Sequence, residues 1–190
     1  MAQSQESRLM KEALQAIAVP KLRKAGFKGS YPHFRRVKED RIDLVSFLGH
    51  SQWGGAFEVG ASIIFQNAAD PQDTNHYFPD QPINIPKLTW GHGRIRTGLP
   101  GTHDNAFYFA DLYSETFMVN GTPCTRYIPV TPAYEKYLEP QLRYQLVQKA
   151  DDQIYERVAQ TVCDQLDDLF DWFDEIQSIS MLREYDRTHS

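Results

Sequence analysis

The feature that most constrains the fold is an alternation of side chains over residues 56–66. One parity holds the apolar residues Phe57, Val59, Ala61, Ile63 and Phe65. The other parity holds the small or polar residues Glu58, Gly60, Ser62 and Gln66. Because successive side chains of a strand point to opposite faces, this pattern predicts a strand with one face in the core. Residues 31–38 and 41–49 have the same period and short turns after them, so we expect an antiparallel meander.

Helical periodicity precedes this predicted sheet. Ser4 or Ser7 can cap a first helix. Its apolar residues recur at helical spacing: Leu9, Met10, Ala13, Leu14, Ile17 and Ala18. Proline has no N–H and its ring crowds the preceding turn, so Pro20 is predicted to disturb or kink the helix, with a second short turn over residues 21–25.

Helical periodicity also follows the predicted sheet, from residue 133 onward and most clearly over residues 151–177. Apolar residues recur there at spacings of three and four: Tyr155, Val158, Val162, Leu166, Leu169, Phe173 and Ile176. The opposite face is acidic, so we expect an amphipathic helix that covers the sheet. The alternative is that this stripe joins two copies of the chain in a homodimer or receives a partner helix.

A long irregular segment lies between these regions. Residues 67–87 contain four prolines and no sustained period. Loops of more than about 12–15 residues are uncommon in compact domains and often serve as lids or binding loops. We therefore expect a functional loop, followed by a strand over residues 88–97.

A hairpin is predicted further along, after a short buried segment at residues 106–109. Residues 115–127 surround Asn120-Gly121, a dipeptide that tolerates the positive φ angles of a type I′ turn. Pro123 would confine this hairpin to a sheet edge, because it cannot donate to a neighbouring strand. A helix over residues 111–118 is the competing interpretation.

Together these signals predict one α+β domain over residues 1–190. We expect an N-terminal helix, an antiparallel sheet of four to six strands, and C-terminal helices packed on one face of that sheet. The helix and the sheet would occupy residues 1–128, and a C-terminal helical segment would occupy residues 129–190.

Charge is distributed unevenly along the chain. Residues 1–41 hold ten Lys or Arg against four Asp or Glu, and residues 150–177 hold nine Asp or Glu against one Arg, within a total net charge of −5. Such segregation can steer a charged partner, unless folding brings the two ends together and cancels their fields. The chain shows neither a secretory leader nor a segment apolar enough to span a membrane, so we expect a cytoplasmic protein.

The strongest binding signal lies in the predicted strand over residues 88–97. Trp90, His92, Arg94 and Arg96 share one parity, so their side chains would share one face. Arginine can grip a carboxylate or phosphate with two parallel hydrogen bonds, which points to an anionic ligand. The plainer interpretation is a solvent-facing strand whose arginines pair with the acidic helix. The remaining candidate ligand- or partner-binding residues are Arg36, Trp53, His76 and Tyr77.

Other kinds of site receive little support. The six histidines show no ligand spacing on one element, so we expect no metal. No GxSxG elbow or phosphate-binding glycine loop is present, and we expect neither catalytic residues nor a cofactor. The pI of about 5.7 argues against binding to nucleic acid.

Three short motifs carry a resemblance to a known family. Gly26-Phe27-Lys28, Phe34-Arg35-Arg36 and Phe57-Glu58-Val59-Gly60 occur in the order found in a bacterial family defined only as a domain of unknown function, DUF4304. The chain resembles this family over about residues 20–100. The resemblance transfers no active site, but similar small α+β proteins lie beside polymorphic toxin genes, which implies an immunity or inhibitor role. The long loop and the long acidic helix are departures from the family pattern.

Two functional hypotheses follow. The first is a binding module without enzymatic activity, such as an immunity-type inhibitor of a bacterial toxin, with the acidic helix or the proline-rich loop as its contact surface. The second is an enzyme or small-ligand protein that holds an anionic substrate on the face of His92, Arg94 and Arg96. A third option is a homodimer joined through residues 151–177.

Overall fold

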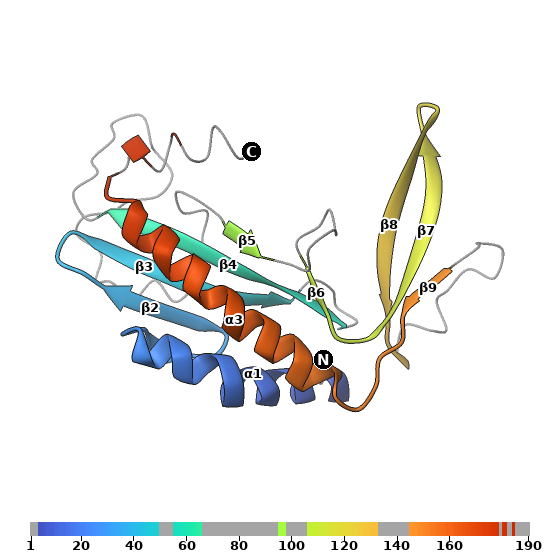
Figure 1. Ribbon diagram of the computed structural model, residues 1–190, viewed down its shortest axis with the longest axis horizontal. Coiled ribbons are helices and arrows are strands. Elements are labelled where there is room, and N and C mark those ends of the chain that lie inside the picture. Colours follow the sequence, from blue (N-terminus) through green and yellow to red (C-terminus); the bar gives the residue numbers. More distant parts are fainter. Residues whose placement is uncertain are drawn as a thin grey trace.

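The computed structural model describes residues 4–49, 55–65, 95–97, 106–132, 145–178, 180, 181 and 184. Two long helices and two antiparallel sheets make up these residues, which confirms the predicted α+β class. The larger sheet and both helices form a body, and the smaller sheet projects from it as an arm (Figure 1).

The body is built on a six-stranded antiparallel sheet. Its strands are β1 (Lys28–Ser30), β2 (His33–Val37), β3 (Arg41–Gly49), β4 (Ala56–Phe65), β5 (Ile95–Thr97) and β6 (Phe107–Tyr108). The order across the sheet is β1-β2-β3-β4-β5, and β6 also pairs with β4. The meander that the alternation predicts is therefore present, with one further short strand before it.

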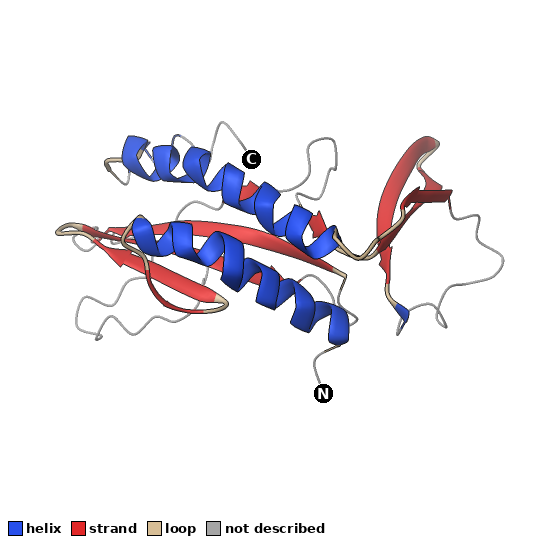
Figure 2. Cartoon of the chain, turned by 60° about the horizontal axis from the view of Figure 1, so that its bottom comes forward, coloured by secondary structure: helices blue, strands red, loops and turns tan. Residues whose placement is uncertain are grey.

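Helices α1 (Gln5–Lys24) and α3 (Ile154–Glu175) lie side by side on one face of this sheet (Figure 2). The sheet face beneath them is the one that the alternation of β4 marks as apolar. The core contains these side chains from the helices and the sheet: Met10, Leu14, Ala18, Leu22, Val45, Phe47, Val59, Ala61, Ile63, Val162, Leu166, Leu169 and Phe173. The predicted stripe of residues 151–177 is thus packed inside the chain.

Helix α1 differs from its prediction in one respect. Its N-terminus is capped by Ser4, whose side chain accepts a hydrogen bond from the Ser7 N–H at 3.2 Å. The helix then continues through Pro20 to Lys24 instead of breaking there. Tertiary contacts outweigh the proline, because Leu22 is fully buried and Lys21 donates to the Cys163 carbonyl of α3 at 2.7 Å.

The arm is a three-stranded sheet made of β7 (Asp111–Val119), β8 (Thr122–Val130) and β9 (Gln145–Gln148), with β7 in the centre. Asn120 and Gly121 form the turn between β7 and β8 with φ angles of 51° and 82°. The predicted hairpin is confirmed, and the competing helix over residues 111–118 is wrong. The sequence did not predict that this hairpin would form a separate sheet.

Strand β9 also corrects the prediction of a wholly helical segment over residues 129–190. Residues 145–148 pair with β7 from Leu112 to Ser114. The amide and aliphatic side chains of this segment fit either structure, so the pairing partner decides its conformation. The predicted strand over residues 88–97 is described only at β5, and residues 88–94 lie outside the described part of the chain.

Candidate functional site

Most of the predicted binding residues lie outside the described part of the chain. This holds for Trp53, His76, Tyr77, Trp90, His92 and Arg94. Arg96 is placed through its backbone in β5, and Arg36 is placed in full in β2. The structure thus locates Arg96 from the predicted arginine strand and one further candidate, Arg36.

Arg96 belongs to a row of residues that crosses the larger sheet. It pairs with Gly60, which pairs with Ser46, which pairs with His33. The His33 ring Nδ1 lies 2.9 Å from the Ser46 hydroxyl. Since cross-strand partners share a face, this row belongs to the face opposite α1 and α3.

Further polar residues are buried on this same face, which we call the polar sheet face. Glu58 is 5% exposed and Ser62 is fully buried, and both make polar contacts. Buried carboxylates and hydroxyls need hydrogen-bonding partners, so their presence indicates an organised polar environment.

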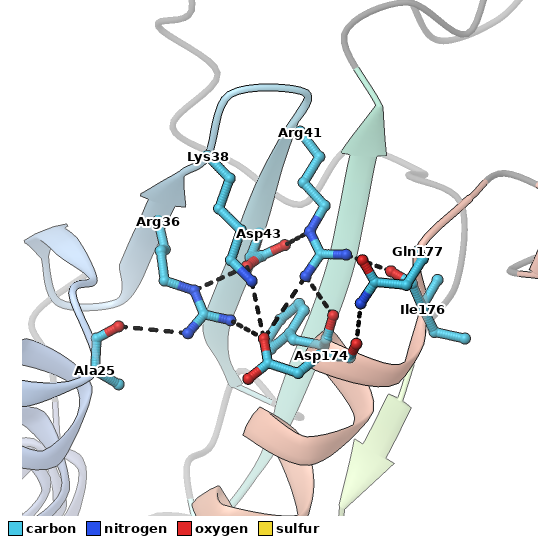
Figure 3. Close-up of polar contacts among 9 residues, drawn as sticks. Ala25, Arg36, Lys38, Arg41, Asp43, Asp174, Ile176 and Gln177 are labelled. Carbon is cyan, nitrogen blue, oxygen red and sulfur yellow. Dashed lines mark hydrogen bonds and ion pairs between the residues drawn. The ribbon is translucent and has the colours of Figure 1, made fainter.

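Arg36 points to the other face, under the helices. Its Nε donates to Asp43 at 2.8 Å, and its guanidinium lies over the rings of Phe27 and Phe173 at 4.9 and 5.6 Å. Arg36 therefore lies on the side of the sheet opposite the pair of His33 and Ser46. Arg36 belongs to an ion network that fastens β2 and β3 to α3 (Figure 3).

This network comprises Arg36, Lys38, Arg41, Asp43 and Asp174. Asp43 lies at its centre with no exposed surface. Its Oδ2 accepts the hydrogen bond from Arg36, and its Oδ1 forms an ion pair with Arg41 Nε at 3.0 Å. Arg41 also donates to the backbone carbonyls of Phe173 and Ile176. Those carbonyls end α3, so the Arg41 side chain caps the helix C-terminus where positive charge is favourable.

Asp174 extends the network to the helix surface. It accepts a hydrogen bond from Lys38 Nζ at 2.8 Å, and the two other cations approach it at 3.6 and 3.8 Å. The hydrogen bond from Lys38 is the main cause that lowers the pKa of Asp174. The pKa of Asp43 is raised instead, because burial disfavours its charged form more than the surrounding cations favour it.

The sequence reading missed this network, although a signal was present. Arg41 and Asp43 interrupt an otherwise apolar strand at alternate positions. Charged side chains on a covered strand face are stable only when paired, so a partner on the covering helix could have been expected. Choosing Asp174 as that partner required the register of α3 on the sheet.

The outer face of α3 carries a line of carboxylates that we call the acidic ridge: Asp164, Asp168, Asp171 and Glu175. Their spacings of four, three and four residues keep them within one narrow strip of the helix. All four are exposed. Among the described residues, none of them forms an ion pair, in contrast to Asp167 and Asp174 on the neighbouring strip.

The acidic ridge is unfavourable for the helix that carries it. Like charges three and four residues apart destabilise a helix by a few tenths of a kcal/mol per pair. Negative charge in the last turn also opposes the helix dipole, and α3 has no basic residue there. The ridge therefore does not stabilise α3, and a contact with another molecule is the role that it suits.

The basic N-terminal end neutralises only the side of α3 that faces it. Lys21 of α1 pairs with Asp167 at 2.8 Å, and Lys38 of the turn after β2 pairs with Asp174. Folding does bring the two charged ends of the chain together. Among the described residues, the ridge takes no part in these ion pairs.

Neither of the described helices is both long enough and apolar enough to cross a lipid bilayer. Within the described ranges, no three His, Cys, Asp or Glu side chains come close enough together to hold a metal ion.

The fold and its surfaces define a small α+β protein with an acidic helical face, a buried ion network and a projecting arm. Comparison with known families then shows that the chain belongs to the family described as a domain of unknown function (DUF4304), which it matches over residues 18–175. No curated protein and no solved structure matches it. The match reaches the last residue of α3, so the acidic helix falls within the family region rather than beyond it.

Proposed function

We propose that this protein is a binding module whose acidic ridge contacts a basic surface on a partner protein. The observation that carries this proposal is the line of four exposed carboxylates. They lack ion-pair partners in the described structure, and their mutual repulsion destabilises the helix that carries them. A basic partner would relieve their mutual repulsion on binding. Complementary charge would also raise the association rate and sharpen the choice of partner.

The finer proposal is an immunity-type inhibitor of a toxin. An inhibitor must bind its target quickly and firmly, and opposite charge on the two surfaces serves the speed of association. A helix held rigidly by the sheet and by the Arg41 cap presents its carboxylates in a fixed array, which lowers the entropy lost on binding. The charge segregation noted in the sequence supports the same role.

The experiment compares three versions of the full chain as bait in the native cell: the wild type, a ridge variant and a control variant. The ridge variant carries Asp164→Asn, Asp168→Asn, Asp171→Asn and Glu175→Gln. The control carries four neutralisations of exposed carboxylates elsewhere: Glu12→Gln, Glu39→Gln, Asp40→Asn and Asp152→Asn. We expect a stoichiometric basic protein to be captured by the wild type and the control but lost from the ridge variant.

The captured protein would then be purified and mixed with each version of the chain. Binding should weaken as salt rises, because exposed charges are screened. Absence of a stoichiometric partner would contradict the proposal, and so would a partner that the ridge variant binds as tightly as the wild type.

A second candidate is a protein that binds a small anion on the polar sheet face. The row of His33, Ser46, Gly60 and Arg96 favours it, because histidine, serine and arginine side chains can each donate a hydrogen bond to an anion. The test is thermal unfolding of the wild type and of Arg94→Ala and Arg96→Ala variants with a panel of phosphates and carboxylates. Stabilisation of the wild type that both variants lose would support this function, and equal unfolding temperatures throughout would exclude it.

A further inference from the structure

The arm carries most of the exposed large apolar side chains of the described chain. Phe117, Met118 and Val119 are 39%, 64% and 45% exposed, and Leu146 and Val147 are 47% and 52% exposed. Three consecutive exposed apolar residues at the end of a strand are unfavourable in water unless another surface covers them. The apolar stripe of α3, through which two copies of the chain could have joined, is buried. Among the described residues, the arm therefore holds most of the exposed apolar surface.

In the described part of the chain, the backbone of the arm is open along one side of β7 beyond Ser114. Residues beside a two-residue turn exchange both hydrogen bonds, and pairs then alternate along the hairpin. Val119 and Thr122 flank the turn, so Thr116 and Met118 direct their N–H and C=O groups away from β8. Strand β9 pairs with β7 only as far as Ser114, and no described strand lies beside Thr116–Val119 on that side.

The opposite edge of the arm is blocked. Pro123 and Pro129 pair with Met118 and Leu112, which are positions where the β8 nitrogen faces outward. Proline offers no N–H there, and this is a common protection of an edge strand against unwanted pairing. The contrast between the two sides indicates where another strand can be added: the Thr116–Val119 part of β7, beyond the end of β9.

We infer that residues Thr116–Val119 of β7 pair with the same segment of a second copy of this chain, so that two arms form one continuous sheet. Two identical edges running antiparallel are complementary about a twofold axis, because each open donor meets an acceptor of the partner. No charged residue lies between Thr116 and Thr125, so this contact brings no like charges together in a chain of net charge −5.

The size of the patch fits a reversible dimer. Phe117 and Val119 alternate with Met118 along β7, so these apolar side chains lie on both faces of the arm and would flank the paired backbones on each face. A standard interface buries about 800 Å² on each partner. The Thr116–Val119 segment is too short to reach this area, so we expect the two arms to dissociate on dilution. The projection of the arm from the body leaves the edge accessible (Figure 1).

The test is sedimentation of the full chain across a concentration series. The wild type should pass from monomer to dimer with rising concentration. Met118→Lys, which places a charge in the patch, and Thr116→Pro, which removes one outward N–H, should each weaken dimerisation at least tenfold. Val37→Lys is the matched control, because Val37 is 55% exposed on the body and its substitution should leave the dimer unchanged.

Hydrogen exchange on the same samples tests the pairing itself. The Thr116 and Met118 amides should gain protection as concentration rises, while the Phe117 and Val119 amides, paired with β8, should be protected throughout. A chain that stays monomeric at all concentrations would overturn the inference, as would a dimer that both arm variants retain. Protection of Thr116 and Met118 that does not depend on concentration would also overturn it, by showing that the same chain covers the edge. The ridge variant should still dimerise, so this result is independent of the proposed function.

Discussion

Asp43 illustrates what a buried charge requires from the residues around it. Its carboxylate has no exposed surface and sits between Arg36 and Arg41. Burial raises its pKa, while the two arginines favour its charged form. Both arginines also approach Asp174, so the ion network that joins β2 and β3 to α3 is centred on this one buried carboxylate.

Arg41→Met should therefore destabilise the protein strongly, because it leaves the buried Asp43 carboxylate and the carbonyls of Phe173 and Ile176 without this cation. Removing one partner of a buried ion pair costs roughly 3–5 kcal/mol, because the charge left behind is uncompensated. Urea unfolding measures this as a lower midpoint. Asp151→Asn is the control, since Asp151 and Arg157 form an exposed pair whose loss should shift the midpoint little. Equal midpoints for the two variants would contradict this account of the network.

Asp174 should contribute to the dependence of stability on pH. Its pKa is lowered in the folded state, mainly by the hydrogen bond from Lys38, so the unfolded chain binds its proton more readily. Its stabilising contribution is present above the unfolded pKa of about 3.9 and is lost as pH falls through the lower folded value. The raised pKa of Asp43 acts in the opposite sense, because protonation of its carboxyl in acid favours the folded state.

Asp174→Asn should consequently flatten the loss of stability below about pH 4, the unfolded-state value for a carboxyl of this type. Free energies of unfolding measured in urea at several pH values would show a smaller decline than in the wild type. An unchanged decline would mean that Asp174 is not coupled to Lys38 in the folded state.

At the scale of elements, the sequence predicted what local periodicity and turn chemistry determine. The alternation of Phe57 to Phe65 located β4, the stripe from Val158 to Phe173 located α3, and Asn120-Gly121 located the hairpin turn. Pairing over long distances was not accessible in the same way. The four residues of β9 have no period that distinguishes strand from helix. Pro20 predicts a disturbance or kink of the first helix, but α1 packs against α3 and continues to Lys24.

The candidate sites were predictable to a similar degree. The acidic face of α3 follows from composition and period, but the division between paired and unpaired carboxylates depends on which strip faces α1 and the β2–β3 turn. Arg36 is a candidate from the sequence because Arg35 and Arg36 face opposite sides of one strand, and one of the two could extend the arginine face. The structure places Arg36 beneath α3, and Arg35 is the residue whose parity matches the polar sheet face.

Two aspartates on α3 should respond to the same substitution with opposite signs. Asp171→Asn should raise the unfolding temperature slightly, because it removes like-charge repulsion and an unfavourable charge in the last turns, worth a few tenths of a kcal/mol. Asp174→Asn, three residues further on, should lower it by removing the bond to Lys38. Calorimetry of both variants at neutral pH would check this. A decrease for Asp171→Asn would mean that the ridge stabilises the helix and needs no partner to explain it.

At the scale of the whole molecule, charge and apolar surface are assigned to different places. The acidic ridge lies on the outer face of the helical layer, and the uncharged end of the arm projects away from the body (Figure 1). One surface is suited to a basic partner and the other to a second copy of the chain. An arm dimer would present two acidic ridges at once, which would increase the apparent affinity for a partner with two binding surfaces.

The most direct test of the central claim is the dissociation constant of the captured basic partner, measured by titration calorimetry for the wild type, the ridge variant and the control variant. The account predicts that the ridge variant binds at least tenfold more weakly while unfolding at an equal or higher temperature, and that the control binds like the wild type. Equal affinities for all three, or an equal loss in the ridge variant and the control, would contradict it.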